Sequence, residues 1–164
     1  PFERVVDLGT GSGRMLTLFG KQAKMSVGLD LSQNMLNIAR ANVSKAGLDK
    51  VELRHGDIFS TRLPHESADL VIVHQVLHYL ADPAAAVAEA ARLVMPGGKL
   101  LIVDFAPHKL EFLREGHAHL RMGFSDQQIE DCIRLIAHSS ALALFVISTQ
   151  SIPCTSCLST ASTW

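Results

Sequence analysis

Short apolar runs alternate along the chain with segments in which apolar residues recur every three or four positions. This alternation is typical of strand and helix units wound around a parallel sheet. The apolar runs predict strands at residues 5–8, 25–30, 51–57, 69–73 and 99–105. The run at 69–73 is almost continuously apolar, as in strands buried on both faces, so we place it near the centre of the sheet. The predicted fold class is α/β, with a doubly wound and mostly parallel sheet.

Polar and small residues mark where the helices between these strands begin and end. Ser32 is a favourable N-cap, and Asp82 precedes an Ala-rich helix that the Pro-Gly-Gly segment at 96–98 ends. Ser125, with Gln128 three residues later, forms a capping box that opens a later helix. Each of these signals is local, so it fixes a helix end without reference to the rest of the fold.

The composition changes abruptly after Arg134. Residues 135–164 contain no Asp, Glu, Lys or Arg, and Ser and Thr become frequent. We therefore divide the chain into a core at 1–138 and an atypical Ser/Thr-rich tail at 139–164. A shifted reading frame or an altered terminus would produce such a change.

Composition and charge exclude several classes of protein. The chain has 164 residues, of which 48% are hydrophobic and 19% charged, as expected for one globular domain. Fifteen Lys and Arg residues against sixteen Asp and Glu residues give a net charge of −1. Such a balance provides no field that would attract a polyanion, so we expect this domain itself to bind no nucleic acid.

The cysteine content and the apolar runs bear on localisation. Three cysteines are too few for a disulfide framework, and the seven-residue apolar run at 141–147 is far shorter than the roughly 20 residues of a membrane-spanning helix. No charged-then-apolar leader opens the chain. We therefore expect a cytoplasmic protein without a membrane span. Because the chain runs almost directly into its first strand, we expect no N-terminal helices, and a fragment of a longer protein would have this form.

The most informative segment is the turn after the first strand, Asp-Leu-Gly-Thr-Gly-Ser-Gly at 7–13. Alternate glycines permit positive φ angles and let a ligand approach the backbone. A dinucleotide fingerprint needs a third glycine three residues after Gly11, where this chain has Arg14. Asp30 ends the second strand, where a doubly wound sheet places the acid that binds a ribose. The pattern favours an adenosine-containing ligand over NAD; a tight turn and a solvated strand end are the alternative.

Five motifs in order resemble the class I S-adenosylmethionine-dependent methyltransferases, in particular the small-molecule group that includes ubiquinone and menaquinone biosynthesis enzymes. Part of the chain also resembles methyltransferase domains fused to ArsR-type DNA-binding domains. The motifs are DLGTGSG at 7–13, VGLDLSQNML at 27–36, HGDI at 55–58, DLVIVHQVLHYL at 69–80 and LVMPGGKLLIVDF at 93–105.

The resemblance implies that S-adenosylmethionine is the cofactor, and it assigns a part of the cofactor to each motif. Two carboxylates are assigned to it: Asp30 to the ribose and Asp57 to the adenine amino group. Asp7 is expected to bind the cofactor's amino group, which the backbone of His74 also reaches; pairing of Asp7 with nearby backbone amides is the alternative. The residues expected to border the methionine part or the adenine are Gly9, Gly11, Gly13, Leu31, Met35 and Ile58. For Met35, plain core packing is the alternative role.

His78 is the candidate catalytic residue. Methyl transfer from a sulfonium needs mainly alignment, but an acidic O or C acceptor also needs a proton acceptor near neutral pKa. His78 follows the predicted fourth strand at the edge that faces the donor methyl group. The alternative is a polar residue that closes the loop before Asp82.

Other motifs carry less weight. We expect no metal, because the His117-Ala-His119 segment lacks the further ligands that zinc requires. The Cys154 to Cys157 spacing has no second pair and is expected to be a coincidence. Arg92 and Arg114 are candidates for facing an acidic substrate, or are simply solvated.

The tail determines how the sheet ends. The resemblance implies a closing antiparallel hairpin, for which residues 142–148 would supply one strand, whereas residues from 149 onward show no alternation. Without a hairpin, the sheet would stay open beside its fifth strand, and such an edge favours association. We expect an aggregation-prone protein whose last residues are irregular.

Three functions are weighed. The first is methyl transfer from S-adenosylmethionine to an O or C nucleophile of a small molecule. The second is a non-catalytic S-adenosylmethionine-binding module cut from a longer protein, such as an ArsR-type regulator. The third is a nicotinamide-dependent oxidoreductase, which the incomplete dinucleotide fingerprint disfavours.

Overall fold

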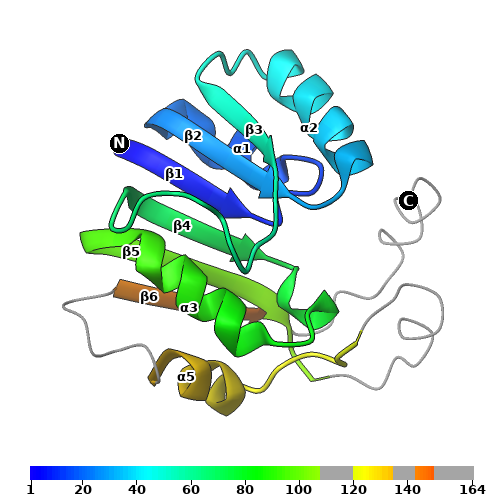
Figure 1. The fold of residues 1–164 in the computed structure, drawn as a ribbon, viewed down its shortest axis with the longest axis vertical. Coiled ribbons are helices and arrows are strands. Elements are labelled where there is room, and N and C mark those ends of the chain that lie inside the picture. The colour runs from blue at the N-terminus through cyan, green and yellow to red at the C-terminus, as the bar shows by residue number, and fades with distance from the viewer. Residues whose placement is uncertain (108–119, 135–142, 150–164) are drawn as a thin grey trace.

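The computed structural model describes residues 1–107, 120–134 and 143–149. Its centre is one sheet of six strands in the order β3-β2-β1-β4-β5-β6, and every neighbouring pair is parallel (Figure 1). The strands are β1 (Phe2–Leu8), β2 (Ala23–Asp30), β3 (Val51–His55), β4 (Ala68–His74), β5 (Val94–Phe105) and β6 (Ala143–Thr149). The predicted fold class is confirmed.

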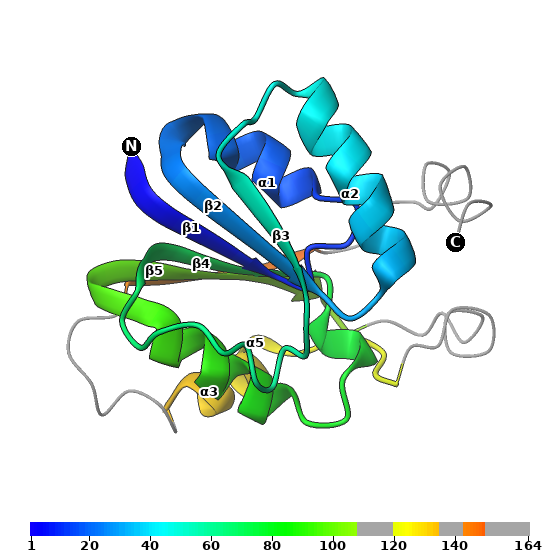
Figure 2. The same ribbon diagram turned by 45° about the horizontal axis from the view of Figure 1, so that its top comes forward.

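Helices cover both faces of this sheet. Figure 2 shows α1 and α2 on one side and α3 and α5 on the other. The helices are α1 (Arg14–Phe19), α2 (Gln33–Lys45), α3 (Pro83–Leu93) and α5 (Asp126–Arg134), with short 3-10 turns η1 (Gly20–Gln22) and η2 (Leu77–Tyr79). In the part of the chain that the structure describes, no helix is both long enough and apolar enough to span a membrane.

The core explains why the fourth strand is almost continuously apolar. Val71 and Val73 belong to the larger buried cluster, which extends to α3 and α5, whereas Leu70 and Ile72 belong to a second cluster next to α1. Successive strand residues point to opposite faces, so both faces of β4 are buried and its central place is confirmed.

The predicted starts of three helices are confirmed in atomic detail, whereas α3 ends at Leu93, before the Pro-Gly-Gly segment that was expected to end it. The Ser32 hydroxyl accepts a hydrogen bond from the Met35 amide at 3.3 Å, and the Asp82 carboxylate accepts one from the Ala85 amide at 3.0 Å. The capping box is reciprocal, since the amide of Ser125 donates to Gln128 Oε1 at 2.9 Å. These bonds satisfy amides that the first turn of a helix leaves unpaired.

Several strand boundaries differ from the expectation: β1 and β2 start earlier than predicted, at Phe2 and Ala23, and the bounds of β3 and β5 also change. β5 starts at Val94 and includes the Pro-Gly-Gly segment, because its pairing with β4 is interrupted between Ala68 and Leu70 and then resumes at Lys99. β3 ends at His55, since the amide of Gly56 already turns back to the Asp30 carbonyl at 3.0 Å.

The last strand corrects the expected end of the sheet. A strand was expected at 142–148 as part of an antiparallel hairpin, but β6 pairs parallel to β5, from Lys99 opposite Ala143 to Phe105 opposite Thr149. The expected open edge beside β5 is therefore wrong, because β6 occupies it. The expected irregular stretch from 149 onward lies outside the described residues except for Thr149 itself, and association through a sheet edge stays a prediction.

Candidate functional site

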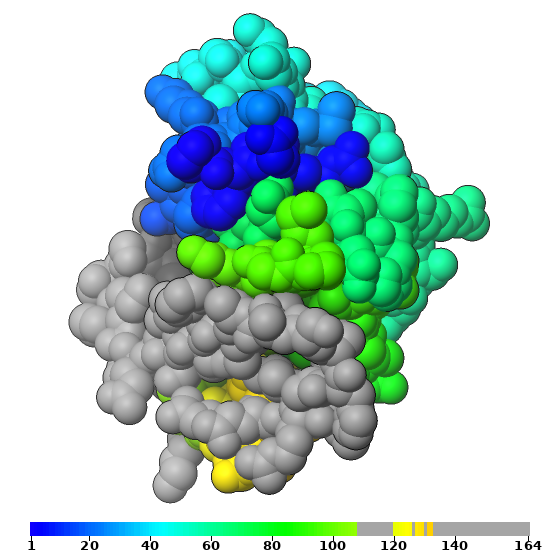
Figure 3. All heavy atoms as spheres, turned by 90° about the vertical axis from the view of Figure 1, so that its left-hand side faces the viewer, coloured from blue at the N-terminus to red at the C-terminus, as the bar shows by residue number. Residues whose placement is uncertain are grey.

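The carboxyl ends of the strands form the edge on which the predicted residues gather. β1 lies between β2 and β4, so the connections leave it in opposite directions, and open α/β sheets bind ligands at such a switch point. Figure 3 views the molecule from the side where β1 begins, opposite this edge. The glycine turn, Asp30 and His74 all lie at the carboxyl ends of β1, β2 and β4.

The glycine turn needs its glycines. Gly9, Gly11 and Gly13 have φ angles of 70°, 52° and 78°, in the left-handed region. A Cβ atom on Gly9 would lie 2.5 Å from the Val76 side chain, whereas one on Gly11 would meet only Met35, at 3.6 Å. The amides of Gly9 and Thr10 donate to the Leu29 carbonyl at 2.8 and 2.9 Å, which fixes the turn against β2.

Asp7 is a buried carboxyl group with spare bonding capacity. Its side chain is 1% exposed; Oδ2 accepts a 2.5 Å bond from the Thr10 hydroxyl, while Oδ1 has no hydrogen-bond partner among the described residues. The pKa of Asp7 is raised to about 7, mainly by burial. The hydrogen bond from Thr10 lowers this pKa in part, and the nearby Asp30 charge contributes to raising it. An acceptor of this kind suits a ligand that brings an N–H donor or a positive charge.

Asp30 connects the glycine turn with α2. Its Oδ2 accepts from the Gly11 amide at 2.7 Å and its Oδ1 from the Ser32 amide at 2.8 Å. A carboxylate can accept about four hydrogen bonds, so roughly two remain for a ligand such as a ribose diol. Asp30 therefore both shapes the turn and retains acceptor capacity.

An apolar surface borders Asp30 on its β3 side. Leu31 is 68% and Phe59 40% exposed, Met35 is half-buried, and the exposed Asp57 accepts the Phe59 amide at 2.9 Å. Ile58, in contrast, is 7% exposed and belongs to the main core. Of the predicted adenine-binding residues, Leu31 and Asp57 are thus exposed and Met35 is half-buried, whereas Ile58 is in the core; the exposed Phe59, directly after the HGDI motif, was not among the predicted residues.

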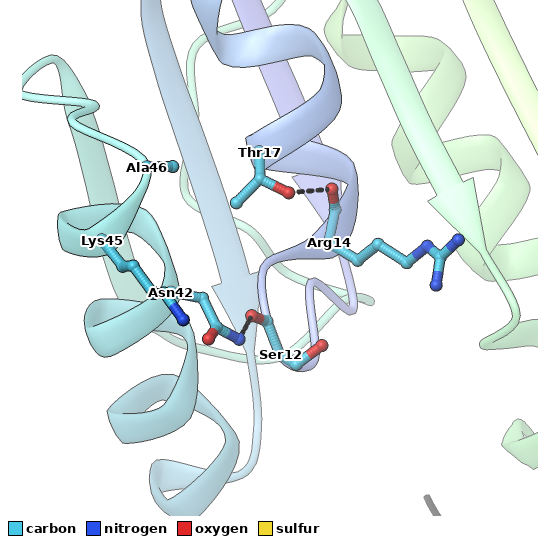
Figure 4. Close-up of a pocket in the computed structure, with 6 residues that line it drawn as sticks. All are labelled: Ser12, Arg14, Thr17, Asn42, Lys45 and Ala46. Atoms are coloured by element: carbon cyan, nitrogen blue, oxygen red, sulfur yellow. Dashed lines mark hydrogen bonds between the residues drawn. The ribbon is translucent and has the colours of Figure 1, made fainter.

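His74 is half-buried at the end of β4. Burial is the main cause that lowers its pKa, and the positive charge of Arg14 lowers it further. Arg14 is exposed, and its guanidinium makes no hydrogen bond or ion pair within the described ranges. Figure 4 shows its side chain pointing away from Lys45.

His78 has a partner that the sequence analysis did not identify. Its Nδ1 lies 2.7 Å from Oδ1 of Asp104, which ends the buried part of β5, and the two residues are 1% and 4% exposed. The Asp104 Oδ2 also accepts from the Leu77 amide at 2.9 Å. The only sequence signal for this pairing was that both residues follow strands at the same edge.

Several other candidates lie elsewhere. The Arg92 guanidinium binds the Glu89 carboxylate at 2.7 Å. The backbone carbonyl of Arg92 accepts from the Glu66 amide, near the start of β4, so Arg92 lies away from the candidate site. Arg114, His117, His119, Cys154 and Cys157 lie outside the described residues. Within the described part of the chain, no three His, Cys, Asp or Glu side chains are grouped as metal ligands.

A shallow pocket lies between α1 and α2, on the outer side of the glycine turn (Figure 4). Its volume is about 380 Å³, and the Asn42 amide spans it to the Ser12 carbonyl at 2.9 Å. The lining residues are Ser12, Arg14, Thr17, Asn42, Lys45 and Ala46. None of the predicted site residues lines it, although Ser12 belongs to the glycine turn.

Comparison with known proteins places this edge in context. The family described as "Methyltransferase domain" matches residues 6–102. The uncharacterized methyltransferase YcgJ of Bacillus subtilis is 30% identical over 105 residues, which are 63% of this chain and 42% of that protein. A demethylmenaquinone methyltransferase of Clavibacter sepedonicus is 29% identical over 115 residues, 70% of this chain and 46% of its own length.

Solved structures agree with the fold. The crystal structure of YcgJ superimposes with a TM-score of 0.73 at 26% identity, covering 82% of this chain and 61% of that one. The crystal structure of a putative methyltransferase of Bacillus halodurans superimposes with a TM-score of 0.74 at 28% identity, covering 82% of this chain and 62% of that one. The chain spans half or less of the curated relatives reported above. Because the family match covers more than half of the chain, the chain belongs to the methyltransferase domain family.

Proposed function

We propose that this chain binds S-adenosylmethionine at the carboxyl edge of its sheet and transfers the methyl group to an O or C nucleophile of a small molecule. The observation that carries the proposal is the unpartnered Oδ1 of buried Asp7 beside a turn of three positive-φ glycines. A ligand ammonium would supply both the missing donor and a charge that favours the ionised carboxylate. Membership of the methyltransferase domain family gives this ligand its identity.

Each part of the cofactor has a matching group in the proposal. Asp7 accepts from the amino group, with the backbone of His74 beside it, and Asp30 accepts from the ribose hydroxyls. Asp57 accepts from the adenine amino group. The glycines Gly9, Gly11 and Gly13 border the methionine part, and the apolar residues Leu31, Met35 and Ile58 flank the base, Ile58 from the core side.

The protein's part in the reaction is alignment. S-adenosylmethionine supplies a methyl group already activated on a sulfonium, and the C–S electron pair returns to sulfur as the acceptor forms its new bond. The glycine turn and Asp30 hold the donor, so that approach of the acceptor in line with the C–S bond becomes effectively unimolecular. The acceptor loses a proton when it is a phenol, enol or acidic carbon.

His78 is the proposed acceptor of that proton. Its ring lies on η2, just beyond the end of β4, and its Nδ1 is held by Asp104 at 2.7 Å. Its 1% exposure supports the other role considered above, a polar residue that closes the loop. His78→Gln separates the two: loss of a general base lowers methyl transfer by about 10²–10⁴-fold with cofactor affinity nearly unchanged, whereas a structural role changes stability instead.

The decisive experiment has two stages. Calorimetry with S-adenosylmethionine and S-adenosylhomocysteine on the purified chain tests binding, with NAD as the competing ligand. A panel of phenols, quinols and thiols incubated with methyl-labelled cofactor then tests transfer, with products identified by mass. Binding without labelled product would favour the non-catalytic module, and binding of NAD alone would overturn the proposal.

A further inference from the structure

Among the described residues, two backbone amides and the His78 imidazole converge on the carboxylate of Asp104 at the end of β5. The Leu77 amide donates to Oδ2 at 2.9 Å, the Phe105 amide donates to Oδ1 at 2.8 Å, and His78 Nδ1 lies 2.7 Å from Oδ1. The His78 and Asp104 side chains are almost completely buried. With little water to compete for these groups, each bond constrains the geometry more strongly than an exposed one would.

The chemistry of the carboxylate determines where the imidazole proton lies. The Asp104 carboxylate already accepts from two backbone amides, and a carboxylate in its ionised form only accepts hydrogen bonds, which makes a His78 Nδ1 at 2.7 Å the donor to that form. In the neutral ring, the lone pair is then on Nε2, because one nitrogen donates and the other accepts. We infer that Asp104 is a positioning residue, which holds neutral His78 in the Nδ1–H tautomer and fastens η2 to the end of β5.

The same carboxylate holds the backbone of the turn. Leu77 and His78 are consecutive residues of η2, and their bonds to Asp104 connect positions 27 and 26 residues apart. The rings of Tyr79 and Phe105 pack against the imidazole at centroid distances of 4.0 and 4.9 Å, which fixes its plane. Both the tautomer and the orientation of His78 therefore depend on β5.

The hydrogen bonds of the glycine turn do not involve this contact. Its amides bind the Leu29 carbonyl and the Asp30 carboxylate, both at the end of β2. Removal of the Asp104 charge should therefore change His78 and leave cofactor binding nearly intact. The consequence for methyl transfer rests on the proposed function, whereas the tautomer does not.

Nuclear magnetic resonance of protein labelled with ¹⁵N-histidine tests the inference without any acceptor. Long-range couplings from the ring protons distinguish the two tautomers, and His78→Gln assigns the signals. We expect the Nδ1–H pattern for His78 in the wild type above neutral pH. Asp104→Asn should lose this pattern, because the side-chain amide of Asn can also donate to Nδ1. Glu89→Gln is the control and should keep the pattern, since the Glu89 carboxylate binds Arg92 and not His78.

A wild-type spectrum with the proton on Nε2 would overturn the inference, even if Asp104→Asn fails to fold. An unchanged His78 pattern in a folded Asp104→Asn protein would overturn it as well. Folding is checked by S-adenosylhomocysteine affinity, expected to stay within about threefold of the wild type. Failure of the wild type to bind that ligand would instead reject the proposed function. With an acceptor in hand, Asp104→Asn should lower kcat about 10²-fold and leave KM for the cofactor unchanged.

Discussion

The backbone amide of Gly11 donates a 2.7 Å hydrogen bond to Oδ2 of Asp30. This bond joins the glycine turn after β1 to the acidic residue that ends β2, two motifs separated by 19 positions. The carboxylate proposed to hold the ribose is therefore also the group that fixes the turn around the methionine part of the cofactor.

Asp30→Ala should weaken S-adenosylhomocysteine binding by roughly ten- to more than a hundredfold. The reason is the loss of hydrogen bonds to a charged acceptor, which costs about 1.5–3 kcal/mol. Calorimetry measures the change, and Asp49→Ala, at an exposed turn position, is the control. Wild-type affinity in a folded Asp30→Ala protein would reject the ribose assignment.

Asp7 should make the free protein less stable as the pH rises. Its pKa is raised from 3.8 to about 7 in the folded state, so the folded chain retains the proton that the unfolded chain has already lost. Stability is therefore full below about pH 4 and falls until about pH 7. Asp7→Asn removes this dependence. The difference in the free energy of unfolding, variant minus wild type, should therefore be about 2–3 kcal/mol larger at pH 8 than at pH 5.

Urea unfolding at the two pH values measures this difference. Parallel pH dependences in the wild type and in Asp7→Asn would show that Asp7 ionises normally in the folded chain. Thr10→Val is a useful companion variant, because the Thr10 hydroxyl bond opposes the rise of the Asp7 pKa and its loss should increase the pH dependence.

Binding of the cofactor's amino group should release the proton of Asp7. Below pH 7 the protonated carboxyl group must ionise to pair with an ammonium, so affinity for S-adenosylhomocysteine should rise by up to about tenfold per pH unit between pH 5 and 7. Calorimetry in buffers of different ionisation enthalpy counts the released proton. A pH-independent affinity, with no buffer effect, would place the amino group elsewhere.

Gly9→Ala should destabilise the fold more than a glycine substitution at a comparable φ angle. Gly9 and Gly47 have φ angles of 70° and 67°, but a Cβ at Gly9 would lie 2.5 Å from Val76, whereas nothing lies within 4 Å at Gly47. Overpacking adds about 1–3 kcal/mol to the backbone cost that both sites share. Denaturant unfolding of Gly9→Ala and Gly47→Ala measures the difference.

The double variant Gly9→Ala with Val76→Ala isolates the cause. Removal of the Val76 methyl groups should restore part of the stability lost in Gly9→Ala, because the 2.5 Å contact disappears while the 3.0 Å contact to Val76 Cβ and the positive φ remain. Equal losses of stability in Gly9→Ala and Gly47→Ala, or no coupling between Gly9 and Val76, would show that the close approach of Val76 does not contribute to the destabilisation.

Local signals in the sequence determined much of this protein. Glycine at 9, 11 and 13, the caps at Ser32 and Asp82, and the capping box at Ser125 each act over a few residues, so their types alone predict the turn and the helix starts. The apolar run of β4 predicted a central strand because burial on both faces leaves no polar position. The cofactor assignments came instead from the resemblance of five motifs to a known family, and each motif includes the end of a strand.

Only the tertiary structure decided the rest. The Asp104–His78 contact spans 26 positions, and no short-range spacing encodes which residues at the ends of β4 and β5 will meet. The raised pKa of Asp7 results from the packing that removes water from it, a property of its surroundings and not of its type. The parallel place of β6 likewise depends on β5 offering a free edge, because side chains alternate between the two faces of a strand whichever way it runs. Sequence patterns are local, whereas contact, burial and strand direction are set by residues far apart along the chain.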